Sequence, residues 1–235
     1  MTSSAAAIDR LNWADIAAQL DAEGYALLPG LLGADLAQGL AYQADTTKVA
    51  QPVSLASGDL GRGELFYFGA SLPVPWMTWR TAFYRHLAVV ANRWNEILDV
   101  GYRYPAKLND FLQRNRQAGQ VQPQSHLNRL GVEDYLALHH RDDGEHVFPL
   151  QVIALLSEPG EDFQGGEFVM TEQRPRMQSR PMVLPLKLGD GAIISTAERP
   201  FKGSRGYYRV NLTHAISRVR SGERIGVELS FHDAR

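Results

Sequence analysis

The residues best suited to bind a metal form a short cluster in the second half of the chain. His139, His140 and Asp142 stand almost side by side, and His214 follows in a separate segment. A His-x-carboxylate pair on one strand with a distant histidine on a facing strand is typical of the triad that holds Fe(II) and leaves coordination positions open. Alternate residues of a strand point to one side, so His140 and Asp142 have the required spacing.

An arginine near the end of the chain adds to this pattern. Arg224 lies ten residues after His214 and opens an alternating apolar segment over 225–231. A guanidinium can hold a carboxylate through two parallel hydrogen bonds, which an ammonium cannot match. Taken alone, the H-x-D triplet is more often a polar strand end with solvated charges. Together with His214 and Arg224 it predicts a site for iron and for a dicarboxylate co-substrate.

Short strands are expected to position these residues. From about residue 122 onward, apolar or alternating runs are separated by turns that contain glycine or proline. The runs lie near 124–130, 134–142, 147–157, 166–170, 182–188, 191–196, 207–216 and 224–232. Eight short strands at this spacing predict a double-stranded β-helix, the jelly roll of cupin-like proteins.

The first half of the chain has mainly helical periodicity. Apolar residues recur at spacings of three and four over 13–20 and over 83–98, and further helices are expected to begin near Ala34 and at Pro105. The segment 25–28 is short and apolar enough for a strand. These patterns predict an α+β protein whose N-terminal helices support the jelly roll.

Composition excludes several other classes of protein. The chain has 235 residues and no cysteine, so a transition metal would have to be held by histidine and carboxylate. Its 24 Lys and Arg and 26 Asp and Glu give a formal net charge of -2, which offers little attraction for a nucleic-acid backbone. We expect one domain over 1–235, with 1–121 as mainly helical support and 122–235 as the jelly-roll core.

The sequence also bears on location. No apolar run reaches the roughly 18 residues of a membrane-spanning helix. The first ten residues lack a basic region followed by an apolar stretch. We therefore expect a cytoplasmic protein without membrane contact, and the sequence predicts no particular oligomeric state.

Longer sequence blocks extend the comparison over nearly the whole chain. They cover 61–64, 67–68, 92–96, 144–151, 156–160, 165–168, 171–180 and 205–212. With the cluster, His214 and Arg224, these blocks resemble a bacterial family of nucleic-acid-type oxygenases within the Fe(II)- and 2-oxoglutarate-dependent dioxygenases. The resemblance implies Fe(II) and 2-oxoglutarate as cofactors and Arg224 as the anchor of the 2-oxoglutarate tail. His126 and Tyr135 lie on strands that lead to the cluster, and both are expected to be structural. The alternative for His126 is a place at the barrel mouth, and the alternative for Tyr135 is a contact with 2-oxoglutarate or substrate.

The same resemblance exposes a departure at the metal-binding motif. In the family the motif is Leu-His-Gln-Asp, and the block that begins here at Gly144 follows after two residues. This register places the first ligand on His139 and the carboxylate position on Arg141. A shift of one residue turns strand side chains to the opposite face, so His139 and His140 cannot both begin a metal-binding pair for one metal without a bulge.

Three outcomes stay open at this motif. A bulge could leave His140, Asp142 and His214 on iron, which gives an ordinary hydroxylase. His139 and His214 could instead hold iron with an open third position, as in halogenases of the superfamily, and Arg141 could attract an anion there. In the third outcome Arg141 weakens metal binding by direct repulsion, and the chain is a non-catalytic binding protein.

The expected activity is the Fe(II)- and 2-oxoglutarate-dependent oxidation of an unactivated C–H bond, with Arg141 as a catalytic residue beside the reacting centre. The family resemblance implies oxidative demethylation of alkylated nucleobases. The acidic charge balance instead favours a small-molecule substrate over nucleic acid.

Overall fold

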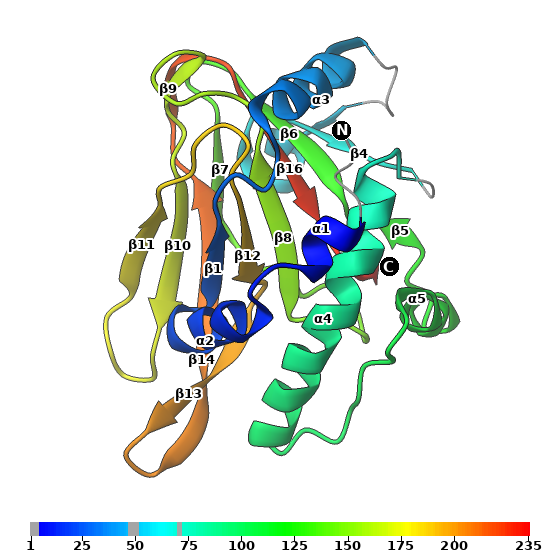
Figure 1. Ribbon diagram of the computed structural model, residues 1–235. Helices are drawn as coiled ribbons and strands as arrows, with labels where there is room; N and C mark the ends of the chain where they lie inside the picture. The colour runs from blue at the N-terminus through cyan, green and yellow to red at the C-terminus, as the bar shows by residue number, and fades with distance from the viewer. Residues whose placement is uncertain (1–4, 47–51, 70–71) are drawn as a thin grey trace.

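Two antiparallel sheets carry the fold of the computed structural model, which describes residues 5–46, 52–69 and 72–235 (Figure 1). The start of the chain, on which part of the expected location depends, therefore lies outside the described residues. The larger sheet has the order β1 (Tyr25–Leu28), β12 (Gly191–Ser195), β8 (Leu150–Leu155), β16 (Arg224–Leu229), β6 (His126–Leu130), β4 (Glu64–Tyr67) and β2 (Val53–Ser54).

The smaller sheet supplies the opposite wall of the barrel. Its order is β11 (Arg180–Leu184), β10 (Phe168–Gln173), β14 (Gly206–Ile216), β7 (Tyr135–His139) and β3 (Gly61–Arg62), and β13 (Glu198–Gly203) pairs with β14. Two minor pairs complete the strands: β15 (Val219–Gly222) with β9 (Phe163–Gly165), and β17 (Asp233–Ala234) with β5 (Gln122–Pro123). The predicted α+β class and its eight core strands are confirmed.

The helices lie beside the larger sheet (Figure 1). They are α1 (Ala5–Asp9), α2 (Trp13–Glu23), α3 (Ala34–Thr46), α4 (Trp76–Ile97) and α5 (Leu108–Gln117), with a 3-10 turn η1 at Leu55–Gly58. Helix α2 ends at Glu23, and Gly24 caps it with a φ of 78°, in the left-handed region that glycine tolerates. Helix α5 begins at Leu108 rather than at Pro105. No helix in the described ranges is long and apolar enough to cross a membrane.

The first half of the chain contributes more strands than its periodicity predicts. Strand β1 pairs with β12, β4 pairs with β6, and β3 pairs with β7, so the N-terminal part extends both sheets as well as covering one of them. Strands β2 and β3 have only two residues each, which is too short for an alternating pattern to be recognised in sequence.

The alternation of β8 divides the core into two parts. All six of its residues are buried. Val152 and Ala154 pack in the cluster formed with the helices, whereas Ile153 and Leu155 pack in the cluster between the two sheets. A strand that is covered on both faces loses the apolar and polar alternation of a half-exposed strand, which explains why every residue of β8 except Gln151 is apolar.

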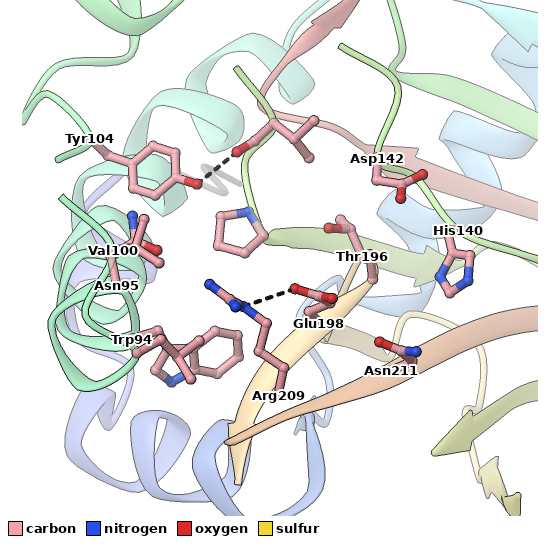
Figure 2. A pocket seen from close by; sticks show the side chains of 14 residues that line it. Trp94, Asn95, Val100, Tyr104, His140, Asp142, Thr196, Glu198, Arg209 and Asn211 are labelled. Atoms are coloured by element: carbon pink, nitrogen blue, oxygen red, sulfur yellow. Dashed lines mark hydrogen bonds and ion pairs between the residues drawn. The ribbon is translucent and has the colours of Figure 1, made fainter. Parts of the chain in front are cut away.

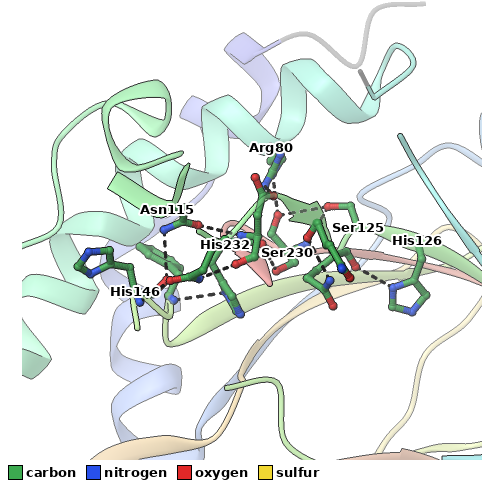
Figure 3. Close-up of polar contacts among 12 residues, drawn as sticks. Arg80, Asn115, Ser125, His126, His146, Ser230 and His232 are labelled. Carbon is green, nitrogen blue, oxygen red and sulfur yellow. Dashed lines mark hydrogen bonds and ion pairs between the residues drawn. The ribbon is translucent and has the colours of Figure 1, made fainter. Parts of the chain in front are cut away.

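A buried polar network fastens the helices to the end of the larger sheet (Figure 3). Arg80 of α4 donates from Nε to the carbonyl of Ser230 at 2.6 Å. Asn115 of α5 accepts the backbone N–H of Asp233 at 2.8 Å. Buried polar groups are costly unless they are hydrogen-bonded, so these contacts fix the helices in one position on the barrel.

Candidate functional site

A β-bulge in β7 decides which residues of the motif enter the barrel. His214 of β14 pairs with His139, but Ile216 pairs with Leu136, so two residues of β7 stand opposite one residue of β14. The extra residue reverses the alternation of side chains, and Leu136 and His139 both face inward. Arg141, two residues after His139, enters the barrel on the same side. The bulge therefore lies before the motif and selects the register of His139 and Arg141.

Seven polar side chains meet inside the barrel. They come from β6, β7, β8, β14 and β16 and from the segment that follows β7. We call this group the barrel cluster: His126, Asn128, His139, Arg141, Gln151, His214 and Glu228. His126 and His214 are fully buried and Glu228 is 2% exposed, so water does not screen these groups.

Glu228 is the carboxylate around which the barrel cluster is arranged. Gln151 donates from Nε2 to Glu228 Oε2 at 3.3 Å, and Asn128 donates from Nδ2 to Oε1 at 3.4 Å. Arg141 Nε lies 3.8 Å from Oε2. Two imidazole nitrogens lie at similar distances, His126 Nε2 at 3.8 Å from Oε1 and His214 Nε2 at 4.0 Å from Oε2.

Burial and charge set the protonation states of the barrel cluster. Burial, and after it the cation of Arg141, lowers the pKa of His126 to about 4. Burial likewise lowers the pKa of His139 and of His214. Burial alone would raise the pKa of Glu228, but the surrounding groups, His126 and Arg141 foremost, hold it at about 2. Near neutral pH the cluster therefore combines three neutral imidazoles, one carboxylate and one guanidinium.

The hydrogen bonds of the histidines define their tautomers. His126 Nδ1 lies 2.9 Å from the carbonyl of Gln124, and His139 Nδ1 lies 2.9 Å from the carbonyl of Ala137. A carbonyl only accepts, so both Nδ1 atoms carry the proton and both Nε2 atoms are acceptors. Arg141 Nη2 lies 3.3 Å from His126 Nε2. His139 Nε2 is buried and has no hydrogen-bond partner within the described ranges.

Arg224 lies deeper in the barrel and is connected to the same cluster. It is 3% exposed and donates from Nε to the carbonyl of Gly166 at 2.8 Å and from Nη1 to Asn128 Oδ1 at 2.7 Å. Burial lowers the pKa of Arg224 to about 10, so the guanidinium stays charged. Asn128 thus bridges Arg224 and Glu228, since it forms a hydrogen bond with each of them. The carboxylate connected to Arg224 in this way is the side chain of Glu228, on the same strand.

The structure separates the other predicted ligands from this cluster. His140 and Asp142 line a cavity of about 560 Å³ outside the barrel (Figure 2). His140 Nδ1 lies 2.9 Å from the carbonyl of Leu212, whereas His214 is fully buried inside. The arrangement of His140, Asp142 and His214 around one metal is therefore not assembled, because the bulge turns His139 and not His140 inward.

Tyr135, for which a contact with 2-oxoglutarate or substrate was the alternative to a structural role, lies at the surface. It is 42% exposed and pairs with Arg62 of the edge strand β3. The structure therefore does not bring Tyr135 together with Arg224 or with the barrel cluster.

The residues of the barrel do not fit the iron of a two-His, one-carboxylate triad. His139 and His214 are neighbours, with ring centroids 4.2 Å apart, but the third position of the motif is the cation Arg141. Within the described ranges, no three His, Asp or Glu side chains are grouped so that they could hold a metal ion.

Comparison with known proteins establishes the family. The model of a family described as "oxygenase, catalysing oxidative methylation of damaged DNA" matches residues 63–234. The chain belongs to this family, which lies among the 2-oxoglutarate- and Fe(II)-dependent oxygenases. Uncharacterized proteins from two strains of Mycobacterium tuberculosis are 41% identical over 155 residues, which are 66% of this chain and 66% of each relative.

Solved structures support the fold. A prolyl-4-hydroxylase from Pseudomonas putida matches with a TM-score of 0.52 and 12% identity, over 95% of this chain and 99% of that protein. An oxidoreductase of the 2OG-Fe(II) oxygenase family from Burkholderia pseudomallei matches with a TM-score of 0.52 and 20% identity, over 96% and 93%. The predicted double-stranded β-helix is confirmed.

Sequence analysis missed the central carboxylate of the site. Glu228 lies in the alternating segment that begins at Arg224, four residues further along β16 and on the same side of the strand. A charged residue at an inward position of a buried strand is unusual unless it is paired. The inward position of a charged residue at Glu228 could be recognised in the sequence. Its pairing with Arg141 could be found only from the fold.

Proposed function

We propose that this chain is a non-catalytic member of its oxygenase family that binds a small organic molecule. The observation that carries the proposal is the position of Arg141. A buried cation stands where the family resemblance places a carboxylate ligand, and it is paired with Glu228 and hydrogen-bonded to His126. A divalent metal beside this guanidinium would be repelled at short range in a poorly screened interior.

The cavity outside the barrel supports the binding role. Its volume of about 560 Å³ is in the range of small-molecule sites. One wall is apolar and includes Trp94, Leu98 and Pro149. Trp94 donates from Nε1 to Asp21 at 2.7 Å, so its ring offers an apolar surface with its polar atom already used.

Another side of the cavity carries hydrogen-bonding groups (Figure 2). His140 and Asp142 lie together there, with Asn211 close by. Glu198 and Arg209, which also line the cavity, pair at 3.2 Å. This combination suits a small polar molecule with an apolar part, of the size of an amino acid or a nucleoside, better than a simple anion.

Thermal-shift and calorimetric titration of wild type with a panel of free amino acids and nucleosides tests the proposal. We expect at least one compound to bind, and Asp142→Ala to weaken that binding about tenfold or more through the lost charged hydrogen bond. Asp143→Ala is the matched control, because Asp143 is an exposed neighbour that does not line the cavity. Absence of binding across the panel, or equal loss in both variants, would contradict the proposal.

A second candidate function is the oxidation of a C–H bond of a small molecule by the chemistry of the family. The observation in its favour is the pair His139 and His214, together with the unsatisfied Nε2 of His139. The family's description names damaged DNA, but the formal charge of -2 gives this chain no general attraction for a phosphate backbone.

Turnover of 2-oxoglutarate to succinate separates the two candidates. Wild type is expected to release no succinate above a no-protein control when it is supplied with Fe(II), 2-oxoglutarate and the compound that binds. Turnover in wild type that is lost in His214→Ala would establish the oxygenase instead.

A further inference from the structure

We infer that the cavity outside the barrel selects an organic ammonium ion, a primary amine that carries an apolar body and no carboxylate. The inference rests on the proposed function, since it names the chemical class of the ligand at that same site. It follows from the hydrogen bonds and the charges of the side chains that line the cavity.

Several lining side chains spend their hydrogen-bond donors on the protein itself. Three of them donate to a protein oxygen at distances from 2.7 to 3.2 Å: Trp94 to the carboxylate of Asp21, Tyr104 to the carbonyl of Val147 and Thr196 to the carbonyl of Phe148. An indole or a hydroxyl has a single donor, so these side chains have none left for a ligand. The two hydroxyl oxygens can still accept.

His140 follows the same pattern. Its Nδ1 lies 2.9 Å from the carbonyl of Leu212. A carbonyl only accepts, so Nδ1 carries the proton, and Nε2 of the neutral ring is an acceptor. The lining of the cavity therefore has more acceptors than donors to offer a ligand.

Asp142 gives the lining an unmatched negative charge. Within the described ranges this carboxylate forms no hydrogen bond and no ion pair. The preceding residue, Arg141, is directed to Glu228 inside the barrel. The other charged side chains of the lining, Glu198 and Arg209, pair with each other at 3.2 Å.

A primary ammonium group fits this lining better than other common polar groups do. It has three donors and no acceptor, and it brings one positive charge. It can therefore supply the donors that the cavity lacks and neutralise Asp142 at the same time. A carboxylate would instead bring further acceptors and a negative charge beside Asp142 and Glu198.

The rest of the ligand is expected to be apolar. Trp94 and Val100 lie on the side of the cavity away from His140 and Asp142 (Figure 2). The volume of about 560 Å³ has room for an aromatic or branched body together with the ammonium group. An amine with these two ends can reach the carboxylate and cover the apolar side together.

Isothermal calorimetry with matched pairs of probes tests the inference. Each pair shares one apolar body and differs in its charged group: phenethylamine with 3-phenylpropionate, tryptamine with indole-3-propionate, and isoamylamine with 4-methylpentanoate. We expect at least one amine to bind wild type about tenfold or more tightly than its carboxylate. Phenylalanine, which has both charged groups, is expected to bind more weakly than phenethylamine.

Asp142→Asn keeps the shape of the side chain and removes its charge. It is expected to weaken amine binding about tenfold or more. Asp143→Asn is the matched control, since Asp143 does not line the cavity, and it is expected to stay within about twofold of wild type. Circular dichroism verifies that both variants fold, and the ranking of the probes on wild type is decisive without them.

The outcomes separate this inference from the proposed function. A carboxylate that binds as tightly as its amine would overturn the inference and leave the proposed binding role intact. An amino acid or a nucleoside that binds while no amine does would have the same meaning. Amine binding that a folded Asp142→Asn variant leaves unchanged would also overturn the inference. If no amine, carboxylate, amino acid or nucleoside binds, the inference and the proposed function both fail.

Discussion

Arg141 Nε lies 3.8 Å from Glu228 Oε2 inside the barrel, with the two side chains only 9% and 2% exposed. This ion pair joins the segment after β7 to strand β16 of the larger sheet. It stands beside the two histidines that the family resemblance assigns to a metal. The pair therefore determines both the stability of the barrel interior and the chemistry that the interior allows.

Removal of the carboxylate from this pair is expected to destabilise the protein strongly. Glu228→Gln leaves the guanidinium of Arg141 buried without its anion, which costs about 3–5 kcal/mol of the free energy of unfolding. Urea denaturation near neutral pH measures the change. Glu223→Gln is the control, because its ion pair with Arg129 at 2.7 Å is more than one-third exposed and is worth about 1 kcal/mol or less.

Replacement of both charges is expected to cost less than the sum of the two single changes. Arg141→Met leaves Glu228 as an unpaired anion, whereas Arg141→Met with Glu228→Leu removes both buried charges. A double-mutant cycle from urea denaturation is expected to give a coupling of about 1–3 kcal/mol. Additive losses would mean that the two side chains do not interact.

Acidification is expected to destabilise the protein before Glu228 is protonated. The pKa of His126 is about 4 in the fold against an ordinary value of 6.5, so the unfolded chain binds more protons between these values. Stability therefore falls as the pH drops from about 6.5 to about 4, by about 3 kcal/mol for this histidine.

Glu228 extends the same trend to lower pH. Its pKa of about 2 against an ordinary value of 4.5 means that its contribution is present above about pH 4.5 and is lost as the pH falls toward 2. Urea midpoints measured from pH 7 downward test both steps. His126→Gln is expected to flatten the first step, and a slope unchanged by this variant would contradict the assignment.

The attachment of α4 to the barrel gives an independent prediction. Arg80→Ala removes a buried hydrogen bond to Ser230 and leaves Asp233 without the cation that lies 3.5 Å away. We expect a loss of about 2–4 kcal/mol. Arg85→Ala on the same helix breaks a half-exposed pair with Asp9 and is expected to lower the unfolding temperature much less than Arg80→Ala does. Equal losses would show that the network of Figure 3 adds no stability.

Periodicity was sufficient to predict the main elements of the fold. The apolar stripe of α4 and the alternating residues of β16 each present one face to a core, and that requirement is visible in a single segment. Strand β13 was missed because Glu198–Gly203 contains a proline and three charged residues beside its glycine. It is a strand because it pairs along its whole length with β14.

The candidate site could be predicted only in part. His139, Arg141 and His214 were identified as candidates from sequence, but the choice between the registers of His139 and His140 depends on the bulge opposite β14. The bulge is a property of strand pairing and leaves no local pattern. The role of Glu228 likewise follows from its contact with a residue far away in the chain.

Anaerobic titration of wild type with Fe(II) and 2-oxoglutarate tests the central claim most directly, with the visible charge-transfer band of the chelate as the readout. The double variant Arg141→Asp with Glu228→Gly, which restores a carboxylate to the motif and removes the internal one, is the matched comparison. We expect no chelate band in wild type and a band in the double variant. A stoichiometric band in wild type that disappears in His214→Ala would contradict the account.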